Sequence, residues 1–451
     1  MIFNKVKNIF LIGIGGIGMS ALARYFIIMN KHLIGYDRQF SQITDELQKL
    51  GVKITFDEHD YSFIDKLESQ KGETLVIYSS AIKKDHSLLN QFIIRDFNIA
   101  KRASVLEIIS NSCKCIAIAG THGKTTTASI LTHILSKSDI KFMSFVGGIM
   151  KNFKSNFLFR GEDYIIVEAD EFDKSFLKLS PDFACITSID PDHLDIYGNK
   201  ENLKNAFKEF ANQINKNGFL ITHENLDFGQ NKYGLQLNSD YQIINYRVAH
   251  GASLFDIKFK SNHYKDILFP MIGMHNVLNA TAAISIANQL GIKWENIISS
   301  IASFEGVERR LSFKIISEKI VYIDDYAHHP EEIIQTYLSL RDTYPDEKIL
   351  VVFQPHLFSR TKDLIEEFAV ALSNFDAVIL LEIYPAREQP IKGINSHLLL
   401  SKIISDFKII STKSEISKYI KKVGCKINIT MGAGDISKEV EKIKEELAYE
   451  I

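Results

Sequence analysis

The feature that most constrains the fold of this chain is a glycine-rich loop near residue 120. Residues 115–127 read Cys-Ile-Ala-Ile-Ala-Gly-Thr-His-Gly-Lys-Thr-Thr-Thr. The apolar run that ends at Ala119 is typical of a buried strand, and the pattern after the loop predicts a helix through Ile134. A strand that enters a helix through such a loop indicates a parallel α/β sheet that binds nucleotide phosphates.

The residue types in this loop suit a nucleoside triphosphate with magnesium. Gly120 and Gly123 allow backbone N–H groups to curl around the β- and γ-phosphates. Lys124 can neutralise charge there, and the Thr125 hydroxyl is placed to ligate magnesium. The loop is shorter than the Walker loop, because the residue five before Gly123 is Ile118 rather than glycine. The alternative, a glycine turn that only caps a helix, leaves the lysine and the threonines unexplained.

Two later strand ends carry candidate metal ligands. Glu168 ends an apolar run that begins at Tyr164, and ligands gather at the carboxyl ends of parallel strands. Magnesium bound to phosphates takes one or two protein carboxylates, so Glu168 is the expected ligand. His193 follows the next strand end and is expected to ligate a second cation or contact the transferred phosphate; its alternative is a structural histidine. Glu171 and Asp173 are interpreted as acids at a helix N-terminus.

A second glycine loop lies near the N-terminus. Gly13, Gly15 and Gly18 form a G-x-G-x-x-G pattern between a strand-like run and an apparent helix. Glycine permits the tight turn and the close approach of a diphosphate to the helix N-terminus. Asp37 ends the next strand-like run, where a ribose partner is expected. The pattern by itself does not distinguish UDP from NAD, and its alternative is a turn with only a packing role.

The order of predicted elements divides the chain into three α/β domains. Short apolar runs alternate with turns and helix-like periods, as is typical of parallel α/β units. New series of such runs begin at Ile9, Cys115 and Ile320. Polar stretches separate the series, and the predicted domains span residues 1–110, 111–308 and 309–451.

The composition excludes several classes of protein. The chain has 451 residues and a formal net charge of -2, so it has no basic field to hold nucleic acid. Its four cysteines fit neither a zinc knuckle nor a disulfide framework and indicate thiols in a reducing compartment. No apolar run approaches the ~18 residues of a membrane span, and no signal peptide pattern opens the sequence. We expect a cytoplasmic protein, a monomer or weak homodimer, without membrane insertion.

These motifs resemble those of the Mur ligase family over nearly the whole chain. The family's marks are Gly-Thr-x-Gly-Lys-Thr, here at 120–125, a strand-end glutamate, here Glu168, and a His-rich strand exit. Gly273-Met-His-Asn-Val-Leu-Asn-Ala-Thr-Ala-Ala matches a family helix, and Arg309-Arg310 matches the entry to the last domain. Asp324-Asp-Tyr-Ala-His-His-Pro matches the first turn of that domain.

Three further segments point, within this resemblance, to the members that add L-alanine. They are Gly15-Gly-Ile-Gly-Met-Ser, Phe353-Gln-Pro-His-Leu-Phe-Ser-Arg-Thr and Tyr384-Pro-Ala-Arg-Glu. The resemblance implies a UDP-binding Rossmann-like N-terminal domain, a central P-loop ATPase-like domain and a Rossmann-like C-terminal domain. It also implies that L-alanine is joined to UDP-N-acetylmuramate with ATP and Mg²⁺, through an acyl phosphate, in peptidoglycan precursor synthesis.

The resemblance further implies roles for individual residues. The residues expected to bind ATP are Gly120, Thr121, His122, Gly123, Lys124, Thr125, Thr126, His275, Asn276, Asn279, Arg310 and Asp325. Those expected to bind the UDP-linked substrate are Gly13, Gly15, Gly16, Ile17, Gly18, Asp37 and Ser80. The expected ligands of magnesium are Thr125, Glu168 and His193. The residues expected to bind the amino acid are Tyr326, His328 and Arg360. Those expected to act in catalysis are Lys124, Glu168, His193, Arg310 and His328.

Structural roles remain open for some of these residues. Asn276 is also suited to an ordinary helix cap, Arg310 to a surface linker, and the segment before Pro330 to a helix start. Leu357 stands where many relatives carry a second arginine, so recognition of the amino acid is expected to differ there. Lys208 lies roughly where other branches use a carbamoylated lysine, and we do not expect that modification.

Three other functions compete with this one. An NAD-dependent oxidoreductase leaves the loop at Lys124 without a task. A non-catalytic nucleotide switch would bind ATP without turnover and does not explain the presence of Glu168, His193, Arg310 and Arg360. The sister ligase that attaches a murein tripeptide to UDP-N-acetylmuramate uses the same chemistry with a larger amine.

Overall fold

The computed structural model describes residues 3–191, 194–386 and 388–448 of the chain. Within these ranges the strands form three sheets, of five, ten and six strands, which confirms the prediction of three α/β domains. The residues group into two compact units. One consists of Met1–Ile243, Lys258–His263 and Asn279–Phe304, and the other of Ile244–Ile257, Tyr264–Leu278 and Glu305–Ile451. Among the described helices, none has both the length and the apolar character that crossing a bilayer requires.

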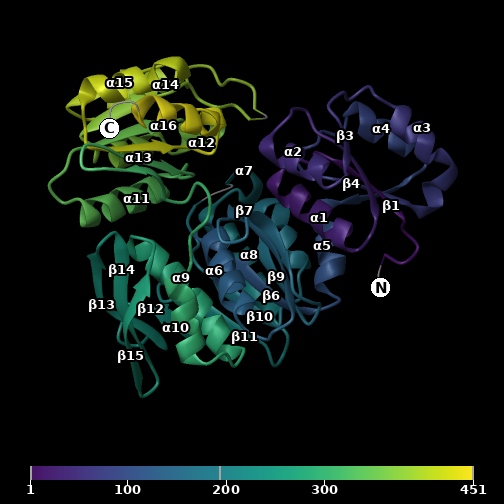
Figure 1. The fold of residues 1–451 in the computed structure, drawn as a ribbon, viewed down its shortest axis with the longest axis horizontal. Coiled ribbons are helices and arrows are strands. Elements are labelled where there is room, and N and C mark those ends of the chain that lie inside the picture. The colour runs from purple at the N-terminus through teal and green to yellow at the C-terminus, as the bar shows by residue number, and fades with distance from the viewer. Residues whose placement is uncertain (1–2, 192–193, 387, 449–451) are drawn as a thin grey trace. The chain divides into compact units, whose positions relative to one another are not determined.

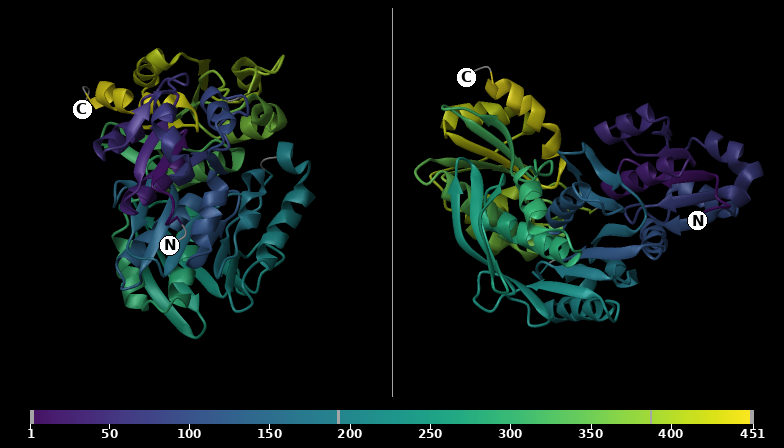
Figure 2. Two further views of the ribbon diagram at one scale, coloured as in Figure 1. Left: turned by 90° about the vertical axis from the view of Figure 1, so that its right-hand side faces the viewer. Right: turned by 60° about the horizontal axis from the view of Figure 1, so that its bottom comes forward.

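The N-terminal sheet is parallel and has the order β3-β2-β1-β4-β5. Its strands are β1 (Asn8–Ile12), β2 (His32–Tyr36), β3 (Lys53–Thr55), β4 (Thr74–Tyr78) and β5 (Asn98–Lys101). Its helices are α1 (Ile17–Ile28), α2 (Gln42–Lys49), α3 (Ser62–Leu67), α4 (Ser87–Ile94) and α5 (Arg102–Ser110). Ile9 and Leu11 of β1 pack in the same apolar cluster as α1, whereas Phe10 and Ile12 pack with α3 and α4. Helices therefore cover both faces of this sheet (Figure 2).

The central sheet has the order β15-β14-β13-β12-β11-β10-β6-β9-β7-β8. Its first strands are β6 (Lys114–Ala119), β7 (Phe142–Met150), β8 (Ser155–Phe159), β9 (Tyr164–Ala169) and β10 (Phe183–Ile186). The remainder are β11 (Phe219–His223), β12 (Asn231–Gly234), β13 (Tyr241–Ala249), β14 (Ala252–Phe259) and β15 (Asn262–Phe269). The helices of this region are α6 (Lys124–Ser136), α7 (Leu194–Tyr197), α8 (Lys200–Asn212), α9 (Met274–Gln289) and α10 (Trp294–Ala302).

Helix α1 joins the N-terminal and central sheets in one apolar core. The Tyr25 ring of α1 lies 5.8 Å from that of Phe145 on β7 and 6.2 Å from that of Phe157 on β8, measured between centroids. The fully buried Asn156 of β8 donates from Nδ2 to the Ile17 carbonyl oxygen at 2.5 Å. These contacts fix the first turn of α1, which follows the glycine loop, against the central sheet.

The C-terminal sheet has the order β16-β17-β21-β18-β19-β20, and in it only the described pair β16–β17 is antiparallel. Its strands are β16 (Ser312–Ile316), β17 (Val321–Asp325), β18 (Ile349–Phe353), β19 (Ala377–Leu380), β20 (Phe407–Ile410) and β21 (Ile427–Met431). Its helices are α11 (Pro330–Thr343), α12 (Phe358–Asp363), α13 (Ile365–Leu372), α14 (Ser396–Lys402), α15 (Ile416–Val423) and α16 (Val440–Ala448). Two apolar clusters, one on each face, pack this sheet between its helices (Figure 1).

Candidate functional site

The predicted phosphate loop joins β6 to α6 at the carboxyl edge of the central sheet. Gly120 has a φ of +130° and Gly123 a φ of +83°, conformations that favour glycine. A Cβ on Gly120 would lie 2.0 Å from Thr187 Oγ1, and one on Gly123 would lie 2.3 Å from Asn279 Oδ1. In the described structure no side chain caps α6, which begins at Lys124, so its first N–H groups are available to an anion.

The Lys124 side chain is folded back onto this loop. Its Nζ donates to the Gly120 carbonyl at 2.5 Å, to the Thr121 carbonyl at 3.4 Å and to Glu171 Oε2 at 2.7 Å. Burial acts to lower the pKa of Lys124, but the carboxylates of Glu171 and Asp170 outweigh burial and raise that pKa. Lys124 therefore carries the positive charge that attraction of a phosphate requires.

Thr125 and Glu168 lie side by side next to the loop. Thr125 Oγ1 donates to Glu168 Oε2 at 2.9 Å, and the Gly147 amide of β7 donates to Glu168 Oε1 at 2.5 Å. A Cβ on Gly147 would lie 2.8 Å from Glu168 Oε2, so the close approach of β7 depends on glycine. A hydroxyl and a carboxylate are hard oxygen ligands and therefore fit Mg²⁺.

The third expected metal ligand, His193, lies outside the described residues. Within the described ranges, no group of three or more histidine, cysteine, aspartate or glutamate side chains could hold a metal ion. The Thr125 hydroxyl and the Glu168 carboxylate, the two expected ligands within the described residues, are in contact beside the phosphate loop.

The segment that leaves β10 anchors the phosphate loop. The Thr121 amide donates to the Ser188 carbonyl at 3.0 Å, and the His122 amide donates to Ser188 Oγ at 3.0 Å. The Asp190 amide donates to Thr121 Oγ1 at 2.9 Å, and the Thr187 hydroxyl donates to the His122 carbonyl. Thr187 and Ser188 were not among the predicted site residues. Their only signal in the sequence is a pair of hydroxyl residues at a strand end.

Helix α9 supplies the second predicted group of ATP-binding residues. Asn279 accepts at Oδ1 from the Thr127 hydroxyl at 3.4 Å, which places it beneath the phosphate loop. Asn276, one turn earlier, is the third residue of α9, is 3% exposed and donates from Nδ2 to the Ile272 carbonyl at 2.9 Å, which is not the contact of an ordinary helix cap. Thr126 is buried within α6. Burial, with a smaller effect of the Arg310 charge, lowers the pKa of His275 to about 4.

Arg310, Tyr326 and His328 lie together at the start of the C-terminal region. Arg310 Nη1 lies 3.6 Å from Glu332 Oε1, and its guanidinium lies 5.2 Å from the centre of the Tyr326 ring. His328 Nδ1 lies 3.0 Å from the Tyr326 carbonyl oxygen and 3.3 Å from Glu332 Oε2. The predicted helix start is confirmed, because Pro330 begins α11. Glu332, which links Arg310 to His328, was not predicted.

Asp325 holds the backbone of this segment. Its Oδ2 accepts from the Leu311 amide at 2.6 Å, and its Oδ1 accepts from the Ala327 amide at 2.7 Å. Burial raises the pKa of Asp325 to about 6, although Arg310 and these amides act to lower it. Both carboxylate oxygens thus have structural partners, and contact of Asp325 with ATP stays a prediction.

Arg360 lies on α12 and is 9% exposed. Its Nη1 lies 3.4 Å from His356 Nδ1. Leu357, directly before this helix, has a φ of +72°, which is uncommon for a leucine. Arg387, within the segment that begins at Tyr384, lies outside the described residues.

The N-terminal glycine loop has the conformation that its pattern predicts. Gly13 has a φ of +83°, and the Gly15 amide donates to Asp37 Oδ2 at 2.8 Å. Asp37, expected to contact a ribose, is therefore engaged with the loop itself. A Cβ on Gly18 would lie 2.9 Å from Arg102 Nη1, so this guanidinium lies against the loop, a position that the sequence did not reveal.

Two further predicted residues of this loop lie at the start of α1. Gly16 precedes the helix and Ile17 begins it, and in the described structure no side chain caps this end. The first turn thus suits a diphosphate. Ser80 is exposed in the turn after β4.

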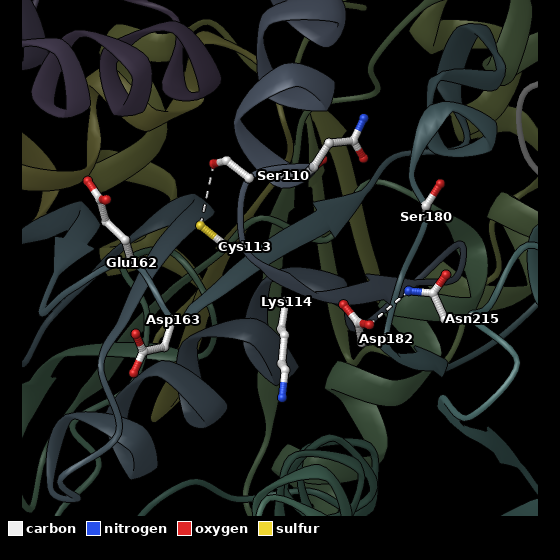
Figure 3. Close-up of a pocket in the computed structure, with 10 residues that line it drawn as sticks. Ser110, Cys113, Lys114, Glu162, Asp163, Ser180, Asp182 and Asn215 are labelled. Atoms are coloured by element: carbon white, nitrogen blue, oxygen red, sulfur yellow. Dashed lines mark hydrogen bonds between the residues drawn. The ribbon is translucent and has the colours of Figure 1, made fainter. Parts of the chain in front are cut away.

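A cavity of about 510 Å³ lies at the other, amino-terminal edge of the central sheet (Figure 3). There Asp182 accepts from Asn215 Nδ2 at 2.8 Å and from the Cys115 amide at 2.8 Å. Lys114, which lines this cavity, begins β6, whereas the phosphate loop follows the end of β6. The acids of this cavity therefore lie away from the phosphate loop.

Models of three protein domains match the chain. The Mur ligase family catalytic domain matches residues 8–113, the Mur ligase middle domain residues 118–287, and the Mur ligase glutamate ligase domain residues 309–434. The UDP-N-acetylmuramate–L-alanine ligase of Flavobacterium psychrophilum is 46% identical over 449 residues, 99% of each chain. That of Christiangramia forsetii is 43% identical over 447 residues, again 99% of each chain.

Solved structures share the fold. The UDP-N-acetylmuramate–alanine ligase of Thermotoga maritima matches with a TM-score of 0.83 and 25% identity, over 98% of this chain and 100% of that one. A murein peptide ligase from Psychrobacter arcticus matches with a TM-score of 0.72 and 22% identity, over 98% of both chains, and shows the fold alone.

Proposed function

The chain belongs to the Mur ligase family, and from that premise we propose that it joins L-alanine to UDP-N-acetylmuramate with conversion of ATP to ADP and phosphate. The observation that carries this proposal is the phosphate loop, where charged Lys124 begins α6 beside the Thr125–Glu168 pair. Relatives of that name aligned over 99% of the chain support the choice of substrates. The reaction contributes to peptidoglycan precursor synthesis.

The first step makes the substrate carboxylate reactive. A carboxylate oxygen of UDP-N-acetylmuramate attacks the γ-phosphorus, the bond to the ADP oxygen breaks, and an acyl phosphate forms. Because both reactants are anions, the task of the chain is electrostatic. Lys124 and the N–H groups of the first turn of α6 bind the phosphates, and the role proposed for Arg310 is to neutralise charge on the transferred group. Thr125 and Glu168 would hold magnesium, which would neutralise further phosphate charge when bound.

The second step forms the amide bond. The neutral amine of L-alanine attacks the acyl carbon, and the carbon–oxygen bond to phosphate breaks as phosphate leaves. Arg360 binds the alanine carboxylate, for which its forked guanidinium is suited, and Tyr326 lines the same site. His328 accepts the proton that the amine loses.

Domain boundaries follow from the same family assignment. We infer a UDP-binding domain at 1–110, an ATP-binding domain at 111–308 and a domain for the amino acid at 309–451. The matched ranges 8–113, 118–287 and 309–434 support these limits. In the first domain, the glycine loop at Gly13 to Gly18 binds the diphosphate of the substrate. Attachment of a tripeptide is not favoured, because the relatives at 43% and 46% identity carry the L-alanine name.

Release of inorganic phosphate tests the proposal. Purified protein is mixed with ATP, magnesium, UDP-N-acetylmuramate and a panel of amines that includes L-alanine, glycine, L-serine and the murein tripeptide. We expect phosphate release that requires both UDP-N-acetylmuramate and L-alanine. Release that requires the tripeptide, or nicotinamide reduction without phosphate release, would overturn the proposal.

A further inference from the structure

All three protons of the Lys124 ammonium are engaged within the protein. An ammonium has three N–H donors, and here they meet two loop carbonyls, those of Gly120 and Thr121, and the carboxylate of Glu171. A phosphate oxygen at this lysine must therefore replace at least one of these acceptors. The charged one, Glu171, is the partner that competes most directly with a phosphate.

The backbone of Glu171 is held in place, and its side chain is buried. Its side chain is 1% exposed, and its backbone carbonyl accepts from the Tyr197 hydroxyl at 2.7 Å and from the Lys174 amide at 3.0 Å. Burial raises the pKa of Glu171, and the Lys124 charge offsets part of that effect. Because the lysine side chain is long and flexible, Lys124 is the more movable member of this ion pair.

We propose that Glu171 is a positioning residue, which holds Lys124 back on its loop until the phosphates of ATP displace the carboxylate. Glu171 thereby weakens nucleotide binding and keeps the loop compact without ligand. This inference rests on the proposed function, since it takes the phosphate loop to be the ATP site. It gives Glu171 a task other than that of an acid at a helix N-terminus.

Calorimetric titration of the full chain with ATP and magnesium tests the inference. Glu171→Gln keeps the shape of the side chain and removes its charge, and we expect about fivefold to tenfold tighter binding, since no charge-assisted hydrogen bond must be broken. Glu162→Gln is the matched control, because Glu162 is exposed at the amino-terminal edge of the sheet, and it should leave the affinity unchanged.

A double-mutant cycle separates this role from a general structural one. In a Lys124→Ala background, Glu171→Gln should no longer tighten binding, because the competition requires the lysine. If Glu171→Gln does not fold, Glu171→Asp, which keeps the charge on a shorter side chain, should tighten binding to a smaller extent. If folded Glu171→Gln binds ATP with unchanged or lower affinity, the inference is overturned. A loss of ATP affinity that occurs only in buffer with magnesium would show that Glu171 binds the metal instead. If the wild-type protein binds no ATP, it is the proposed function that fails.

Discussion

Glu168 Oε2 accepts a hydrogen bond from the Thr125 hydroxyl at 2.9 Å, and this contact links β9 to the first turn of α6. Glu168 Oε1 accepts a hydrogen bond from the Gly147 amide at 2.5 Å, so strand β7 also holds this carboxylate. Two elements thus set the direction of a carboxylate that we propose to bind magnesium. That direction depends on the space which glycine leaves at position 147.

Gly147→Ala should impair the magnesium-dependent reaction while the chain stays folded. The added Cβ would lie 2.8 Å from Glu168 Oε2 and must displace the carboxylate. We expect phosphate release to fall about tenfold, as is typical when a residue that orients a metal ligand is changed, with a higher magnesium requirement. Gly72→Ala is the control, since a Cβ there meets no atom within 4 Å. Equal magnesium titration curves for the two variants would argue against this role of Glu168.

The strand, loop and helix around Lys124 could be predicted because their signals are local. An apolar run, two glycines and a helical period follow one another without interruption, and β6 and α6 lie where that order requires. Thr125 and Glu168 were both predicted as ligands of magnesium from their positions at a helix start and a strand end, and they meet because β6 and β9 are neighbouring parallel strands. The signals for these elements do not depend on distant parts of the chain.

Contacts between distant segments could not be predicted. Gly147 approaches Glu168 only because β7 pairs with β9, and the sequence near Gly147 carries no sign of that pairing. Glu332, in the first turn of α11, likewise contacts Arg310, which lies 22 positions earlier in the sequence. The strands β13 to β15 were missed as well, although His250 and Gly251, both with positive φ, form the turn typical of a tight hairpin.

Lys124→Ala should abolish most of the activity and also lower stability. Loss of the cation at the phosphates should reduce the rate of phosphate release by about 10³-fold. The variant leaves Glu171, 1% exposed, without its ion-pair partner, which costs about 3 kcal/mol in buried pairs. Lys137→Ala, at the opposite end of α6, is the control. Thermal melting and a phosphate assay measure the two effects, and a variant as active as its parent would contradict the site assignment.

Stability should fall as the pH drops below 6.5, in part because of His133. This side chain is 2% exposed, and burial, followed by the charge of Lys137, lowers its pKa to about 4. Between about pH 4 and pH 6.5, His133 binds a proton in the unfolded chain but not in the folded chain, so acidification favours unfolding. The free energy of unfolding should fall by about 3 kcal/mol once this range has been crossed.

Melting temperatures at pH 7.5 and pH 5 check this expectation. His133→Phe keeps the packing against Phe153 and Phe304 but cannot be protonated, so its loss of stability between the two pH values should be smaller. The exposed His397 serves as the comparison, and His397→Gln should melt with the same pH dependence as the parent. Equal pH dependence in the His133 variant would show that this histidine is not the cause.

Arg360→Lys should weaken binding of the amino acid selectively. Lysine keeps the charge but cannot form the two parallel hydrogen bonds that a guanidinium makes with a carboxylate, so the KM for L-alanine should rise about tenfold or more. The affinity for ATP should not change, because no part of the phosphate loop is altered. Lys362→Ala, exposed on the same helix, is the matched control for loss of a nearby positive charge. Initial rates over a range of L-alanine concentrations, together with ATP titrations, separate the two substrates. A KM that stays at the parent value in Arg360→Lys and in Arg360→Ala would place the alanine carboxylate on other residues.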